Sequence, residues 1–240
     1  MNYWVLAGAA IAGYLFGSIS FSRIIHRIVA PDEKLTETEV PVEGTELKYK
    51  VTTFGATAVS MKHGPKVGCS IGFADILKVV IPVLFFRLMF PEDPYMYIAA
   101  AAGMIGHNWP VYYKFKGGRG ISAYYGGLFV IDWLGGIVTM TAGMVFGFFI
   151  VRDFFVAYMA GLWFLIPWAW FMTHRYDYLA YAILVNIIYI VAMLPDLKQY
   201  IKIRKTTKVT TKMVLELSPM GRGMLKISEW FKSIFKIKKG

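Results

Sequence analysis

Long apolar runs recur along this chain, and each is too hydrophobic to remain exposed to water. A helix needs about 20 residues to cross the ~30 Å hydrocarbon core of a bilayer, and fewer where a neighbouring segment covers it. Seven segments meet this requirement, at residues 3–25, 71–90, 95–113, 121–134, 135–151, 154–172 and 178–194. The sequence therefore predicts an all-α polytopic transmembrane helix bundle of about seven spans. The count is six if Gly135-Gly136 does not divide the fourth run from the fifth.

The positive charges predict how this bundle is oriented. The chain is 57% hydrophobic, with a mean hydropathy of +0.51 and a net charge of +11. Such a charge would suggest nucleic acid in a soluble chain, but here the positive-inside rule and anionic lipid account for it, and no nucleic-acid partner is expected. With the N-terminus outside, the inner segments hold 23 of the 26 lysines and arginines, at residues 22–70, 114–119, 152 and after 194. We therefore expect a multi-pass cell-membrane protein whose C-terminus is cytoplasmic.

Composition divides the chain into a membrane bundle at residues 1–195 and a basic tail at residues 196–240. The first span has no basic residue before it, while Arg23 and Arg27 follow it, which is the wrong polarity for a cleaved signal peptide. Within the bundle, the cytoplasmic loop 26–70 begins with an acidic stretch of alternating Thr, Val, Leu and Tyr residues. This stretch predicts either a short hairpin or a flexible connection.

The tail contains an amphipathic pattern at residues 223–238. At 100° per residue, Ile227, Phe231 and Ile234 share one arc, and lysines fall on the other side. A basic amphipathic helix of this kind lies in the plane of the lipid headgroups or docks on a protein partner. Packing of the helix against its own bundle is the alternative.

A short basic stretch rich in glycine, GHNWPVYYKFKGGRGIS at residues 106–122, lies between two apolar runs. Glycines allow backbone N–H groups to approach a ligand closely, and a nearby cation completes a phosphate site. Here both come just before an apolar helix, whose N-terminus adds a partial positive charge. The stretch lacks the GxxxxGK[ST] pattern of a P-loop. Taken alone, it fits a phosphate site or an ordinary positive loop at the cytoplasmic end of a span.

The order of motifs along the chain is more specific. YLFGSISFSRII in the first span is followed by FGATAV and GPKVG, by FADILK, and by GHNWPVYYKFKGGRGIS. This succession resembles the bacterial glycerol-3-phosphate acyltransferases that use acyl phosphate as donor. The resemblance implies a seven-helix enzyme of phospholipid synthesis with its site at the cytoplasmic membrane surface. Its substrates would be acyl phosphate and glycerol 3-phosphate, and its partner would be the membrane lipid around it. The enzyme would need no metal or organic cofactor.

The resemblance also implies roles for individual residues. Lys116 and His107 would be catalytic. The substrates would be bound by Ser18, Gly55, Thr57, Lys62, Gly117, Gly118, Arg119 and Gly120. Because acyl phosphate is already activated, holding two phosphates and the reacting atoms in line would supply most of the rate.

Several positions depart from the family pattern. After the GAT motif the family has Asn and then an arginine, where this chain has Ala58 and Met61. A guanidinium that binds phosphate in a bidentate manner is not replaced by methionine. The Ser-rich stretch after the fifth span and the His/Asn motif after the last span are also absent. The alternative function is therefore a catalytically degenerate relative that serves as a structural or lipid-binding subunit of a larger membrane complex.

Other polar residues within the apolar runs have two interpretations each. Asp75 and Lys78 are one helical turn apart, and they form either a helix-surface pair or a pair in which Lys78 faces a polar pocket. Asp132 and Asp177 fall near the outer ends of their spans, where we expect them to be solvated.

Overall fold

The computed structural model describes residues 1–35, 38–41, 48–51, 53–151, 153–206 and 225–226. Its helices are α1 (Tyr3–Gly17), α2 (Phe21–Val29), α3 (Ala56–His63), α4 (Pro65–Met89), α5 (Tyr95–Asn108), the 3-10 turn η1 (Val111–Tyr113), α6 (Ile121–Ile131), α7 (Trp133–Val145), α8 (Phe154–Trp168) and α9 (Tyr176–Thr206). Two π-helical turns, η2 (Phe146–Val151) and η3 (Ala169–Thr173), extend α7 and α8. Helices thus lie in each of the seven predicted segments.

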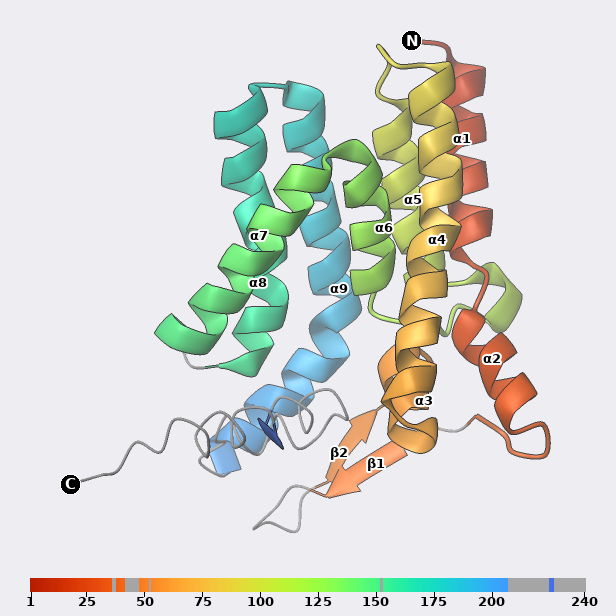
Figure 1. The fold of residues 1–240 in the computed structure, drawn as a ribbon, viewed down its shortest axis with the longest axis vertical. Helices are drawn as coiled ribbons and strands as arrows, with labels where there is room; N and C mark the ends of the chain where they lie inside the picture. The colour runs from red at the N-terminus through yellow and green to blue at the C-terminus, as the bar shows by residue number, and fades with distance from the viewer. Residues whose placement is uncertain (36–37, 42–47, 52, 152, 207–224, 227–240) are drawn as a thin grey trace.

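Four of the described helical segments are long and apolar enough to cross a membrane, namely Tyr3–Val29, Pro65–Met89, Trp133–Val151 and Tyr176–Ile203. In Figure 1, α1, α4, α5 and α6 stand together on one side of the bundle, and α9 separates them from α7 and α8. Small residues bring the helices into close contact: a Cβ on Gly13 or Gly17 of α1 would overlap the backbone of α5. Such close approach is how helices associate in lipid.

The structure corrects two predicted boundaries and shows a break within the first span. That span reaches beyond residue 25 as predicted, but its helix stops at Gly17 and restarts at Phe21. Helix α4, which contains the predicted second span, begins at Pro65 rather than at residue 71. The division between the fourth and fifth spans falls at Asp132, not at Gly135-Gly136, because the Asp132 side chain caps α7 by accepting from the N–H of Gly135.

Asp132 is half-buried rather than solvated, which also corrects the sequence expectation. Its carboxylate accepts hydrogen bonds from Gly135 N at 2.8 Å, Trp168 Nε1 at 2.8 Å and Tyr178 Oη at 3.0 Å. Asp177 is partly buried and pairs with Arg175. The two carboxylates differ because the α6–α7 corner packs against α8 and α9, which bring hydrogen-bond donors to Asp132.

The polar loop forms a hairpin, one of the two predicted alternatives. Strands β1 (Thr38–Pro41) and β2 (Lys48–Val51) pair antiparallel, with Thr38 opposite Val51. The hairpin lies below the bundle beside α3 and the last turns of α9 (Figure 1). Gln199 of α9 fastens it: the Gln199 side chain accepts from Lys50 N at 3.0 Å and donates to Lys50 O at 3.2 Å. The predicted amphipathic tail helix lies outside the described residues except for Leu225 and Lys226.

Candidate functional site

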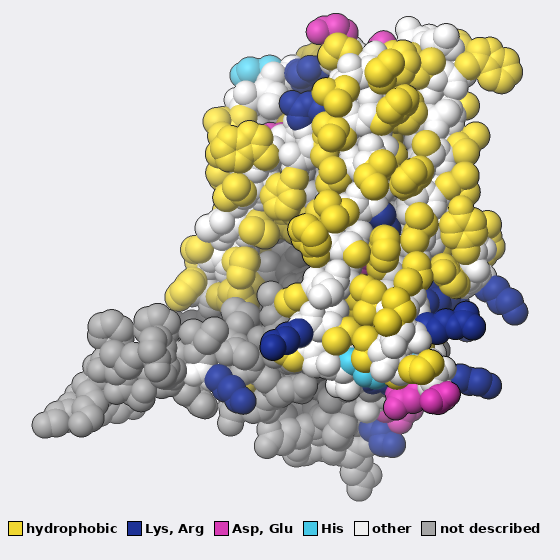
Figure 2. Space-filling model, turned by 45° about the vertical axis from the view of Figure 1, so that its right-hand side comes forward, with side chains coloured by type: hydrophobic (Ala, Val, Ile, Leu, Met, Phe, Trp, Pro, Cys, Tyr) yellow, Lys and Arg dark blue, Asp and Glu magenta, His cyan; other side chains and the backbone are white. Residues whose placement is uncertain are grey.

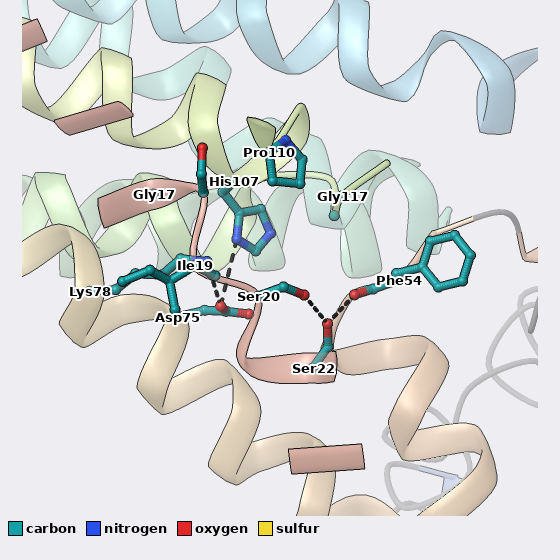
Figure 3. A pocket seen from close by; sticks show the side chains of 12 residues that line it. Gly17, Ile19, Ser20, Ser22, Phe54, Asp75, Lys78, His107, Pro110 and Gly117 are labelled. Carbon is teal, nitrogen blue, oxygen red and sulfur yellow. Dashed lines mark hydrogen bonds and ion pairs between the residues drawn. The ribbon is translucent and has the colours of Figure 1, made fainter. Parts of the chain in front are cut away.

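A small polar pocket forms where the first span breaks. Residues 18–20, which connect α1 to α2, are the α1–α2 break, and residues 114–120 are the KGG turn. The pocket lies among the α1–α2 break, Phe54, the middle of α4, the end of α5 and the KGG turn, and it is small, with a cavity volume of about 10 Å³. Figure 3 shows side chains from these separate segments converging on it. Residues far apart in sequence therefore build one site.

Three buried polar side chains form one wall of this pocket. Lys78 Nζ lies 2.7 Å from Asp75 Oδ1, and His107 Nδ1 lies 3.7 Å from the same oxygen. Lys78 also donates to the carbonyl of Ile19 at 2.6 Å. The side chains of Lys78 and Asp75 are only 3% and 4% exposed, so the pair faces the pocket and not the helix surface. The second interpretation of this pair from the sequence is thus confirmed.

The opposite wall is the KGG turn, whose shape depends on its glycines. The chain enters it through Lys114 and Phe115, both with positive φ, and leaves through Gly120 at φ +86°. Gly118 donates its N–H to the carbonyl of His107 at 3.1 Å. A Cβ on Gly118 would overlap the imidazole of His107. Glycine is therefore what allows the turn to lie directly against the end of α5.

Four predicted site residues line the pocket together: Ser18, His107, Gly117 and Gly118. Gly55 borders them, since a Cβ there would lie 3.6 Å from Gly118 Cα. Within the described part of the chain, buried Ser18 Oγ and His107 Nδ1 have no hydrogen-bond partner. A buried polar group without a partner costs free energy, so these two atoms mark positions where a polar ligand would be stabilising.

The other predicted residues lie outside the pocket lining. Thr57 is exposed in the first turn of α3, and Lys62 is exposed near its end. Lys116 is exposed on the KGG turn. Gly120 packs against the Asn108 side chain and allows α6 to begin. The exposure of Thr57 and Lys62 follows from the orientation of the short helix α3, which buries Ala58 and Val59 and turns these two polar side chains outward.

Arg119 has a structural partner that the sequence did not indicate. Its guanidinium forms a two-bond ion pair with the carboxylate of Asp196 on α9, including Nη2 to Oδ1 at 2.9 Å. The Asp196 side chain is 8% exposed. The KGG turn is thereby fixed to the C-terminal half of α9. This pair directs the Arg119 guanidinium toward α9, and its substrate-binding role stays a prediction.

Arg23 is a basic residue near the pocket that the sequence analysis did not predict as a site residue. There it was used only as one of the positive charges that orient the first span. It donates from Nη1 to Ser20 Oγ at 3.1 Å and from Nη2 to the Lys116 carbonyl at 2.7 Å. Its guanidinium carbon lies 4.5 Å from the ring centroids of both Phe54 and Tyr113. The signal was its place in GSISFSR, directly after the small polar residues that end α1.

Ser22 completes this corner of the site. Its hydroxyl donates to the carbonyl of Phe54 and lies 2.9 Å from Ser20 Oγ. Phe54 in turn donates its N–H to the Gly117 carbonyl at 3.2 Å. A chain of polar contacts therefore joins α2, the segment before α3 and the KGG turn. Among the described residues, no three His, Cys, Asp or Glu side chains are grouped so that they could hold a metal ion.

Comparison with known proteins relates this geometry to a family. The chain is 30% identical over 190 residues to the glycerol-3-phosphate acyltransferase of Mycoplasma mycoides subsp. mycoides SC, which covers 71% of this chain and 69% of that relative. It is 31% identical over 143 residues to that of Pelagibacter ubique, covering 58% of this chain and 63% of the relative. The matched region thus spans a little less than two thirds of the Pelagibacter protein.

The fold has a counterpart among solved structures. The crystal structure of PlsY (YgiH), an integral membrane glycerol 3-phosphate acyltransferase, in its glycerol 3-phosphate form matches with a TM-score of 0.67 and 22% identity. The match covers 83% of this chain and 93% of that one. The comparisons give no support to a degenerate relative over a membrane acyltransferase. Because a family model described as glycerol-3-phosphate acyltransferase also matches residues 42–203, this chain belongs to the glycerol-3-phosphate acyltransferase family.

Proposed function

We propose that this protein is a membrane acyltransferase that transfers an acyl group from acyl phosphate to the 1-hydroxyl of glycerol 3-phosphate. The observation that carries the proposal is the pocket at the α1–α2 break. It combines the buried, unpartnered hydroxyl of Ser18 with the cluster of Asp75, Lys78 and His107, and a glycine turn closes it. The proposal includes no metal or organic cofactor.

The pocket suits phosphorylated substrates because it offers a cationic donor beside main chain that a ligand can approach closely. Gly117 and Gly118 bring main chain to the wall without side chains in the way. Lys78 has three N–H donors, and its bonds to Asp75 and Ile19 use two of them. We assign the remaining donor to a substrate oxygen. Lys116, exposed on the KGG turn, would contribute its charge at the rim of the pocket.

The reaction itself makes modest demands on the protein. The 1-hydroxyl oxygen attacks the acyl carbonyl carbon, a new C–O bond forms, and the bond from that carbon to the phosphate oxygen breaks. The phosphate leaves with the electron pair. His107, whose Nδ1 has no hydrogen-bond partner among the described residues, accepts the hydroxyl proton and passes it to the departing phosphate. Alignment of the reacting groups and fixed donors supply most of the rate.

The proposed site faces the cytoplasm and meets the lipid surface. Figure 2 shows apolar side chains over the length of the visible face, and Lys and Arg side chains mainly around its lower end. The pocket lies toward that end, beside α2, α3 and the KGG turn (Figure 1). An excess of cations at one end supports a cytoplasmic assignment for it. An acyl donor with its chain in the bilayer would then reach the pocket from the membrane, and the basic tail would serve as the site for any protein partner.

Purified protein supplied with acyl phosphate and glycerol 3-phosphate tests the proposal. Release of phosphate together with 1-acylglycerol 3-phosphate is the expected result. His107→Ala and Lys116→Ala should each lower kcat/KM by a factor of about 10² or more, the scale of losing one transition-state group. Lys66→Ala, an exposed lysine at the start of α4, is the matched control and should retain activity. Absence of product from well-folded wild-type protein in lipid would contradict the proposal.

A further inference from the structure

The positive charges around the pocket are not equivalent. Lys78 is neutralised by the carboxylate of Asp75, and Arg119 is paired with Asp196 on α9. Arg23 is different: among the described residues, no carboxylate lies within ion-pair distance of its guanidinium. A reaction between two phosphorylated molecules brings several negative charges into one pocket, so an uncompensated cation next to the residues that line it is valuable.

Arg23 is also held in a fixed position. Its two hydrogen bonds, to Ser20 Oγ and to the Lys116 carbonyl, attach it to the α1–α2 break and to the KGG turn. Its guanidinium carbon lies 4.5 Å from the ring centroids of Phe54 and Tyr113, within the range of cation–π attraction. Ser20, Ser22 and Phe54, which surround it, all line the pocket (Figure 3). The arginine is therefore held in a fixed position directly behind residues that line the pocket, through its contacts with Ser20 and Phe54.

The hydrogen bonds leave donors for a ligand. A guanidinium has five N–H donors in a planar fork, and the two bonds to protein use two of them. Phosphate oxygens match this fork, as carboxylate oxygens do, since each accepts a charge-assisted bond.

We propose that Arg23 is a phosphate-binding residue of this pocket and takes the role that sequence reasoning gave to Lys62 and Arg119. The proposal rests on the proposed function for its substrates, glycerol 3-phosphate and acyl phosphate. The shared chemistry is a phosphate group, and kinetics with each substrate varied separately distinguishes the two. A ligand on Arg23 would also act on the KGG turn, because the same guanidinium bonds to the Lys116 carbonyl.

The experiment compares Arg23→Gln, Arg23→Lys and the control Arg27→Gln. Arg27 lies one turn further along α2 and is exposed, so its loss removes the same charge outside the pocket. We expect Arg23→Gln to raise the KM for one phosphorylated substrate at least tenfold with a smaller change in kcat. Arg23→Lys should recover part of that loss, and Arg27→Gln should resemble the wild type. The substrate whose KM rises is the one that Arg23 binds.

A purely structural role for Arg23 predicts a different pattern, namely a lower kcat and lower thermal stability with unchanged KM values. That result would overturn the proposal. Isothermal titration of inorganic phosphate into the purified proteins provides an arm that does not depend on turnover. If the wild type binds phosphate and Arg23→Gln binds it at least tenfold more weakly, the proposal stands even if no acyl transfer is found. Equal binding by the two, or no binding by the wild type, would refute it. If Arg23→Gln does not fold, the same comparisons are made with Arg23→Lys.

Discussion

Removing the carboxylate of Asp75 while keeping its shape tests whether the polar wall of the pocket is an ion pair on which stability depends. Asp75→Asn would leave Lys78 with the Ile19 carbonyl but without a compensating charge. Both side chains are almost fully buried, at 3% and 4% exposed. Loss of one partner of a buried pair costs about 3–5 kcal/mol, because the remaining charge stays desolvated. We expect about 3 kcal/mol, the lower end of that range, because asparagine keeps an acceptor oxygen.

The matched control is the pair of Arg175 and Asp177. Its closest N–O distance is also 2.7 Å, but its side chains are 49% and 29% exposed. An exposed pair contributes about 0–1 kcal/mol, so Asp177→Asn should change stability little. Thermal denaturation in detergent, followed by size-exclusion chromatography of the heated samples, measures both variants. The expected fall in Tm is roughly 6–12 °C for Asp75→Asn and no more than about 4 °C for Asp177→Asn.

A double substitution separates charge from packing. Asp75→Leu with Lys78→Met removes both buried charges, and such replacements are often neutral or stabilising. We therefore expect the double variant to be more stable than either single variant, while acyl transfer is lost because the pocket no longer has its ammonium group. If Asp75→Asn melts with the wild type, or if the double variant is no more stable than the single ones, the pair is not the stabilising element inferred here.

Three further predictions concern the surroundings of the pocket. Gly118→Ala should lower kcat/KM at least tenfold in a steady-state assay, because its Cβ would displace the His107 imidazole; near-normal activity would contradict the close packing. Asp196→Asn should cost about 2 kcal/mol in thermal denaturation, because it removes the charge that pairs with Arg119, and exchanging the two charges should restore part of it. Asp132→Asn should cost about 1–3 kcal/mol through its three hydrogen bonds, yet retain activity, since it lies at the far end of α6 from the KGG turn.

The sequence by itself determined the type of fold and the family. Apolar runs of spanning length require helices whatever their neighbours are, because lipid offers no partner for backbone hydrogen bonds. The order of the GSIS, GAT, FADILK and KGG motifs indicated the family, and this order can be read without the tertiary structure. His107, Ser18, Gly117 and Gly118 could be named as site residues on that basis, and all four line the pocket.

Only the tertiary structure decided which cations face that pocket. Hydropathy gives the length of a helix but not the direction of a side chain, so Asp75 and Lys78 stayed ambiguous until α4 was packed against its neighbours. The interruption of the first span between Gly17 and Phe21 was invisible to hydropathy, yet it is what brings Arg23 to the KGG turn. Arg119 meets Asp196 across a separation of 77 residues in the sequence. Partners so distant in sequence are set by helix packing, which composition and local motifs do not encode.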